Sequence, residues 1–127
     1  MEFVSTDKAP KPAGHYSQGV VHNGVVYVSG MLAVDPETGE KRLGSVEEQT
    51  RIALGSMEGV LQASGSSKDQ VLSVTVYVSD VALWGRVNAV YAEFFGEHRP
   101  ARAVVPTRDL HFGFLVEVAC IAAVGGE

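Results

Sequence analysis

The stretch Val20–Val28, with the sequence VVHNGVVYV, sets the fold of this chain. It consists of two β-rich runs around Asn23-Gly24, the residue pair that best tolerates the positive φ angles of a type I′ turn. We therefore expect two antiparallel strands joined by a two-residue loop. The second strand is expected to continue to Val34, where Asp35-Pro36-Glu37-Thr38-Gly39 is typical of a turn.

Two helices are expected after this hairpin. Ser45-Val46-Glu47-Glu48 is a capping box, and apolar residues then recur at helical spacing up to Gly65, the expected left-handed C-cap. Asp80 is expected to cap a second helix with an apolar stripe. Gly55 and Gly59 form a GxxxG pattern, which we interpret as close packing of the first helix on a sheet.

The order of elements predicts the layers of the fold. Further strands are expected at Val71–Val78, Ala103–Val105 and Phe114–Val124, which gives the order ββαβαββ. This order is typical of an α+β sandwich, in which two helices cover one face of a mixed sheet. Because the strands are apolar on both sides, we expect the uncovered face to pack against another subunit of an obligate oligomer.

Length and charge limit the classes of function. A chain of 127 residues with 46% apolar residues has the size of one domain, which we place over residues 1–127. It has 10 basic and 15 acidic residues and a formal net charge of -5, so we expect no nucleic-acid partner. No apolar stretch reaches the roughly 18–20 residues of a membrane-spanning helix, and Met1-Glu2-Phe3 lacks a signal pattern. We therefore expect a cytoplasmic protein with no membrane partner.

Standard catalytic signatures are absent from the sequence. It contains no GxSxG, GxxxxGK[ST], GxGxxG or HExxH motif. The histidines are scattered without the spacing of metal ligands, so we expect no metal; they are His15, His22, His98 and His111. Cys120 is the one cysteine and is interpreted as an inert buried thiol, in agreement with a reducing compartment.

Glu117 and a group of arginines stand out against an ordinary core. Glu117 interrupts the most apolar strand, where a carboxylate is costly unless it is paired or hydrogen-bonded. Arg99, Arg102 and Arg108 occur together with no acid among them. One interpretation is a buried ion pair between Glu117 and an arginine. In the other, Arg102 binds a substrate carboxylate through two parallel N–H···O bonds while Glu117 orients or deprotonates a water.

Three further positions have open alternatives. Tyr16, in the connector after Gly14, either covers a pocket or fills a gap in the core. Gly30 follows Ser29 within a strand, where a glycine indicates either the close approach of a ligand or backbone, or a β-bulge. Asn88 lies beside the apolar stripe of the second helix, where it either stabilises a loop or faces the site.

Five motifs, taken in order, resemble one known family. They are Gly14-His15-Tyr16-Ser17-Gln18-Gly19-Val20, Val28-Ser29-Gly30, Val87-Asn88-Ala89-Val90-Tyr91-Ala92-Glu93-Phe94-Phe95, Pro100-Ala101-Arg102 and Val116-Glu117-Val118. Together they resemble the YjgF/RidA family of reactive-intermediate (enamine/imine) deaminases, and the resemblance covers nearly the whole chain.

The resemblance implies a fold, an assembly and a reaction. The fold is a chorismate-mutase-like α+β sandwich that forms a homotrimer, with sites in clefts between neighbouring subunits. Arg102 is implied to hold the carboxylate of a 2-imino or 2-enamine acid, and Glu117 to position the water that releases ammonia and a 2-oxo acid. No cofactor is expected, because a protonated imine is already electrophilic at carbon. The implied substrate-binding residues are Tyr16, Ser29, Gly30, Asn88 and Val104.

The sequence departs from the family pattern at three positions. His15 stands where a proline is common, Met31 where a glutamine is common and Val104 where a cysteine is common. Met31 and Val104, together with the segment His111-Phe112-Gly113-Phe114, are expected to reshape the pocket and therefore the preference for substrate.

The leading hypothesis is an imine/enamine deaminase acting on small 2-imino acids, similar to 2-iminobutanoate/2-iminopropanoate deaminase. One alternative is a hydrolase of a pathway-specific enamine such as aminoacrylate or 2-aminomuconate. Another is a non-catalytic module that binds 2-oxo acids through Arg102. Nucleic-acid cleavage has been attributed to family members, but the acidic charge balance argues against it here. Replacing Glu117 by Gln separates these classes, because a binder keeps its affinity and a deaminase loses rate.

Overall fold

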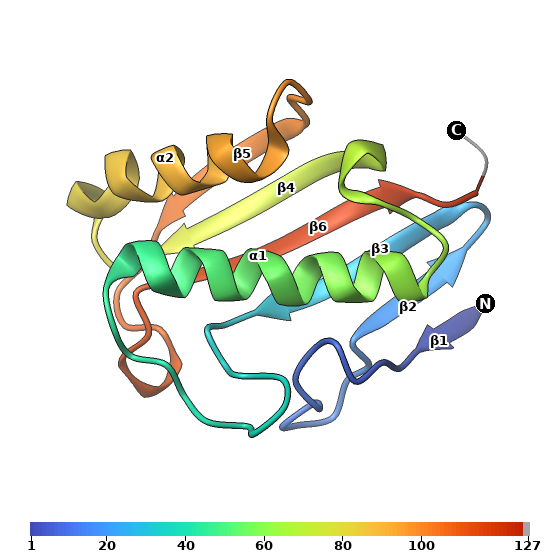
Figure 1. Cartoon of the computed structure of the whole chain (residues 1–127), viewed down its shortest axis with the longest axis horizontal. Helices are drawn as coiled ribbons and strands as arrows, with labels where there is room; N and C mark the ends of the chain where they lie inside the picture. Colours follow the sequence, from blue (N-terminus) through green and yellow to red (C-terminus); the bar gives the residue numbers. More distant parts are fainter. Residues whose placement is uncertain (126–127) are drawn as a thin grey trace.

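The computed structural model describes residues 1–125, in which two helices lie on one face of a six-stranded mixed sheet (Figure 1). The strands are β1 (Glu2–Val4), β2 (Gly19–His22), β3 (Val25–Met31), β4 (Val71–Val78), β5 (Ala101–Pro106) and β6 (Val116–Ala123). Their spatial order is β1-β2-β3-β6-β4-β5, with β4 and β5 parallel and the other neighbours antiparallel. The expected α+β architecture is confirmed.

The hairpin that begins the fold forms as its sequence predicts. His22 pairs with Val25 across a loop of two residues, Asn23 and Gly24. Their φ angles are 52° and 76°, as a type I′ turn requires. Because this turn fixes the register of β2 and β3, it also fixes which residues of β3 face the helices.

The first helix begins and ends at the expected signals. In α1 (Val46–Ala63), the Ser45 side chain accepts a hydrogen bond from the Glu48 amide at 3.2 Å. After the helix, Gly65 has a φ of 79°, and the Ser66 amide donates to the Leu61 carbonyl at 2.8 Å, which closes a Schellman motif.

The second helix does not begin at Asp80 as expected but follows a short 3₁₀ turn. Asp80 caps the turn η2 (Val81–Leu83) by accepting from the Ala82 amide at 2.9 Å. This turn leads directly into α2 (Trp84–Phe95), which ends before Gly96 with a φ of 66°.

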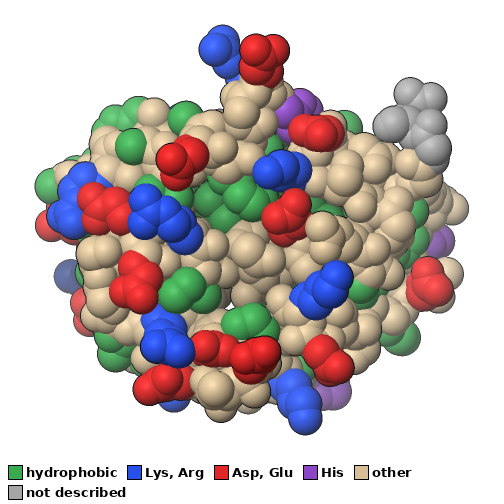
Figure 2. Space-filling model, viewed as in Figure 1, with side chains coloured by type: hydrophobic (Ala, Val, Ile, Leu, Met, Phe, Trp, Pro, Cys, Tyr) green, Lys and Arg blue, Asp and Glu red, His purple; other side chains and the backbone are tan. Residues whose placement is uncertain are grey.

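The core lies between the sheet and the two helices. Alternate residues of the central strands point into it, so each strand contributes a row of buried valines. Its fully buried residues include Val26, Val74, Val76, Val78, Val116 and Val118 from the sheet and Leu54, Met57 and Leu61 from α1. Each such side chain contributes about 1.5–3 kcal/mol on leaving water. The outer surface above the helices carries acidic and basic side chains interspersed (Figure 2).

The opposite face of the sheet has no helix over it. Tyr27 on β3 and Ile121 on β6 pair across this face and remain 50% and 37% exposed. Val105 of β5 is exposed to the same extent as Ile121. Several exposed apolar side chains on one face of a sheet are typical of a contact surface. Packing of this face against another subunit stays a prediction.

Several strand boundaries differ from those expected. Glu2–Val4 pairs with β2 as an additional strand, which the sequence did not predict because three residues are too few to show a period. The order is therefore βββαβαββ rather than ββαβαββ. The strand β3 ends at Met31 rather than Val34, and Val34 instead forms an isolated bridge with Lys41. β5 is longer than the expected Ala103–Val105, and β6 is shorter than the expected Phe114–Val124.

The GxxxG interpretation of α1 is wrong. A Cβ on Gly59 would lie 2.7 Å from both the Cβ and the carbonyl oxygen of Lys8, so Gly59 lets the N-terminal segment cross the helix rather than the sheet approach it. Gly55 has open space around the same position.

The two glycines make a matched pair of stability tests. Gly55→Ala is expected to raise the free energy of unfolding by about 0.5–1 kcal/mol, because alanine loses less conformational freedom in a helix. Gly59→Ala is expected to lower it by about 1–3 kcal/mol, because backbone must move. Urea denaturation of both variants measures the difference, and changes of the same sign would contradict this packing.

Candidate active site

Glu117 lies on the uncovered face of the sheet, in the space that Gly30 leaves open. In the sheet, Glu117 lies opposite Tyr77 of β4. A Cβ added to Gly30 would meet the Glu117 carboxylate, with the carboxyl carbon 3.0 Å away. Gly30 also sits within the register shift between Val28 and Met31. The β-bulge interpretation of this glycine agrees with this shift, and the group that approaches it closely is the Glu117 side chain rather than a backbone segment.

The Glu117 carboxylate is half-buried and unpaired. Among residues 1–125 no ion pair joins it to an arginine, so the interpretation of an ion pair with an arginine of its own chain is wrong. Burial raises the pKa of Glu117 above its usual value, and the nearby charge of His111 offsets part of that rise. An unpaired carboxyl with a raised pKa is suited to general acid–base chemistry.

Ser29 ties the connector before β2 to β3. Its hydroxyl donates to the Ser17 carbonyl at 2.5 Å, and its amide donates to the Gln18 carbonyl at 3.0 Å. The neighbouring Tyr16 is half-exposed, and its hydroxyl accepts weakly from the Ala13 amide at 3.4 Å. Ser29 therefore positions the segment that carries Tyr16.

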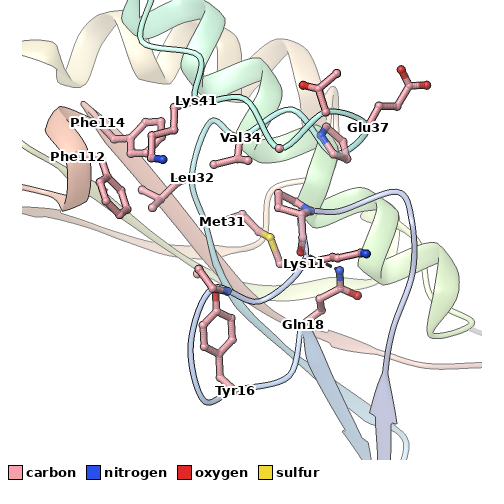
Figure 3. A pocket seen from close by; sticks show the side chains of 16 residues that line it. Lys11, Tyr16, Gln18, Met31, Leu32, Val34, Glu37, Lys41, Phe112 and Phe114 are labelled. Carbon is pink, nitrogen blue, oxygen red and sulfur yellow. Dashed lines mark hydrogen bonds between the residues drawn. The ribbon is translucent and has the colours of Figure 1, made fainter.

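A cavity of about 420 Å³ opens beside Gly30. Its wall includes Tyr16, Gly30, Met31, Leu32, Phe112 and Phe114. Figure 3 shows the side chains of Phe112, Leu32 and Met31 bordering one space, with Tyr16 at another side of it. Since Gly30 both lines the cavity and supports Glu117, the carboxylate and the cavity are neighbours.

Arg102 lies in a separate cluster against α2. Its guanidinium carbon is 4.9 Å from the ring centroid of Trp84 and 4.7 Å from that of Tyr91. One of its nitrogens donates to Asn88 Oδ1 at 2.8 Å. These side chains, one to two helical turns apart on α2, hold the guanidinium plane in place. A second hollow of about 390 Å³ lies beside them and is lined in part by Arg99.

Arg102 and Glu117 belong to opposite sides of the sheet. Arg102 pairs with Val74, which is buried under the helices, whereas Glu117 pairs with Tyr77 on the uncovered face. Val104 pairs with Val76 and so lies on the Arg102 side. Each chain therefore carries two separate groups, Arg102 with Asn88 and Glu117 with its cavity, rather than one assembled site.

Two buried glutamines, Gln18 and Gln49, hold the loops on the Glu117 side by hydrogen bonds. Sequence reasoning did not assign a role to either. The Gln18 amide nitrogen donates to the Pro10 carbonyl at 2.9 Å, and its oxygen accepts from the Thr6 amide at 2.7 Å. The Gln49 oxygen accepts from the Leu115 amide at 2.9 Å, just before β6. The sequence signal for both is a polar residue within an otherwise apolar pattern, which does not reveal its distant partner.

The remaining candidates have structural roles or lie apart. His98 Nε2 is 2.8 Å from the Val71 carbonyl oxygen and so ties the end of α2 to β4. Burial raises the pKa of the Cys120 thiol to about 12, as expected for an inert thiol. His15 is exposed in the connector.

Neither a metal cluster nor a membrane span is found in the described part of the chain. Residues 1–125 contain no group of three or more His, Cys, Asp or Glu side chains placed to hold a metal ion. In the same range no helix has both the length and the apolar character needed to cross a membrane.

Known proteins resemble this chain along nearly its whole length. A family model described as Endoribonuclease L-PSP matches residues 6–124. The crystal structure of a Thermotoga maritima protein superposes with a TM-score of 0.95, 43% identity and 99% coverage of both chains. The rat 2-iminobutanoate/2-iminopropanoate deaminase is 36% identical over 98% of this chain and 90% of its own. The chain belongs to the YjgF/RidA family.

Because the chain belongs to the YjgF/RidA family, its relatives include deaminases. At the level of the family, the similarity to the rat enzyme supports a hydrolase of the deaminase type. The structure of E. coli TdcF with bound serine also superposes, with a TM-score of 0.93, 31% identity and coverage of 98% of this chain and 100% of that one. A YjgF/RidA relative thus binds a small molecule that carries a carboxylate.

Because the Glu117 carboxylate is half-buried and forms no ion pair in the described chain, a variant without its charge is expected to be more stable than the wild type. Because the folded chain binds the Glu117 proton more tightly than the unfolded chain does, stability falls as the pH rises from the usual glutamate pKa of 4.5 through the raised pKa. Glu117→Gln removes the charge and is expected to raise the Tm at pH 7, with no difference from wild type below about pH 4.

Thermal unfolding across this pH range measures the effect. Glu93→Gln, an exposed carboxylate on α2, is the control and is expected to leave the Tm nearly unchanged. A lower Tm for Glu117→Gln at pH 7 would mean that the charge is paired after all.

Proposed function

We propose that this protein hydrolyses 2-imino and 2-enamine acids to 2-oxo acids and ammonia, in sites shared between the copies of a homotrimer. The observation that carries the proposal is the separation of Arg102 from Glu117 on opposite sides of the sheet. One chain supplies a held cation and an unpaired carboxylate that face different directions, so a neighbouring copy is needed to bring them together. The apolar uncovered face, with Tyr27 and Ile121, gives the copies a surface to join.

Arg102 binds the carboxylate of the substrate. Asn88 occupies one guanidinium nitrogen, and the Trp84 and Tyr91 rings fix the plane of the group, which leaves further N–H donors free to form a fork. Asn88 thus has a positioning role, and the geometry suits a planar carboxylate better than a point charge would.

Glu117 supplies the proton chemistry. Its carboxylate takes a proton from a water as the water oxygen forms a bond to the imine carbon, which gives a tetrahedral carbinolamine. The same carboxyl then returns the proton to the nitrogen and, again as carboxylate, takes the proton of the carbinolamine hydroxyl as the C–N bond breaks and the C=O bond of the 2-oxo acid forms. The departing ammonia accepts this last proton and leaves as ammonium. One water is consumed for each imine, and an enamine enters the same route after protonation at carbon gives its imine.

The cavity beside Glu117 holds the rest of the substrate. Tyr16 and Gly30 line it, and Ser29 keeps the Tyr16 connector in position. Val104 lies on the Arg102 side, where it replaces a thiol with an apolar group.

The test is release of a 2-oxo acid from imines generated by an amino-acid oxidase, with semicarbazide trapping any imine that escapes. Wild type is expected to suppress trapping, and Arg102→Ala to lower kcat/KM by about a hundredfold or more, because a charged fork to the substrate is lost. Arg51→Ala, an exposed arginine of α1, is the matched control and is expected to keep full activity.

The same assay separates the deaminase from a binding module. Glu117→Gln is expected to abolish turnover while 2-oxo acid affinity changes little, since the carboxylate of the ligand lies at Arg102. Wild type that never exceeds the uncatalysed rate, while still binding 2-oxo acids, would favour the non-catalytic alternative.

A further inference from the structure

Resting on the proposed deaminase function, we propose that the cavity beside Glu117 is a subsite for large apolar side chains of the substrate, and that Phe112 is its specificity-determining residue. Imines of leucine-like and phenylalanine-like amino acids are then the preferred substrates, larger than the small imino acids that the sequence suggested. The proposal depends on the shape, the lining and one unusual residue of this cavity.

The cavity is larger than a small imino acid requires. Its volume of about 420 Å³ lies within the roughly 300–1,000 Å³ of pockets that hold drug-sized ligands, which are larger than the imine of a four-carbon amino acid. Since unfilled apolar space loses contacts, a larger side chain gains more from this site.

One part of the cavity lining is apolar. Met31, Leu32 and Val34 follow one another along the chain as it leaves β3, and Phe112 and Phe114 come from the loop before β6 (Figure 3). Apolar walls with a few polar groups are typical of sites that bind apolar ligands.

Phe112 is held in an unfavourable and exposed position. Its φ is 58°, in the left-handed region that bulky residues rarely adopt, and its side chain is 63% exposed. The ring packs edge-on against Phe114 at 6.4 Å and 89°, and Lys41 Nζ lies 4.5 Å from its centroid. A fixed aromatic ring at the mouth of a cavity is therefore available to contact whatever enters.

The subsite lies beside Glu117. Gly30 lines the cavity while its missing Cβ gives space to Glu117. On the other side, the His111 ring lies 5.7 Å from that of Phe112, and the charge of His111 acts on Glu117. A substrate whose imine carbon lies at Glu117 can therefore direct its side chain toward Met31 and Phe112.

Charged side chains of both signs also line the cavity: Lys11, Lys41 and Glu37. Because the lining is not of one charge, its apolar wall rather than its charge selects the side chain of the substrate. Neutral apolar side chains are the class that this wall accepts.

The experiment measures kcat/KM for imines generated from alanine, 2-aminobutyrate, leucine and phenylalanine. Wild type is expected to favour the two large substrates over alanine by about tenfold. Phe112→Ala is expected to lower kcat/KM for the large substrates by about tenfold and to change that of alanine by less than about twofold. Phe112→Asn removes the ring but suits left-handed backbone, so it is expected to give the same pattern without disturbing the loop.

Leu72→Ala is the matched control, because Leu72 is also an exposed apolar residue but lies at the far end of the sheet from Phe112. It is expected to leave all four values unchanged. A wild-type preference for the alanine imine, or an equal loss for all four substrates in both Phe112 variants, would overturn the subsite. If no imine is hydrolysed by wild type, the proposed function itself fails and this inference fails with it.

Discussion

The two-residue period of the β-sheet is the constraint on which the rest of this structure depends. Successive side chains of a strand point to opposite faces, so the pairing of β5 and β6 with β4 decides the direction of every candidate side chain. Arg102 shares a row with Val74, under the helices, and Glu117 shares a row with Tyr77, on the open face. A shift of one residue in either strand would reverse these positions and bury a charge in the core.

The uncovered face of the sheet carries a group that lowers stability, whereas the helix-covered face does not. Glu117 sits half-buried and forms no salt bridge within the described chain, and a glycine rather than a larger residue lies beside it. The core could be stable without this arrangement, since Val116 and Val118 on either side are fully buried under the helices. A carboxylate kept in such a position at the expense of stability is typical of groups that act on a substrate.

Local signals in the sequence predicted most of the fold, because a hairpin turn, a capping box and a Schellman glycine act within a few residues. The three-residue β1 was missed since its order comes only from pairing with β2. At the site, the sequence identified Arg102, Glu117 and Gly30, but it could not place Arg102 between Trp84 and Tyr91 or foresee the buried amides of Gln18 and Gln49. Those contacts join segments far apart in the chain, and no short pattern encodes them.

Activity restored by mixing two inactive variants tests most directly whether the site is shared between copies. Arg102→Ala and Glu117→Gln chains would be unfolded together and refolded at equal amounts, beside each variant alone and wild type. If each site takes its arginine from one copy and its glutamate from a neighbour, random assembly gives intact sites in about a quarter of cases, and the mixture recovers about a quarter of wild-type activity. A mixture as inactive as the separate variants, from an assembly shown to contain both chains, would contradict a site built between subunits.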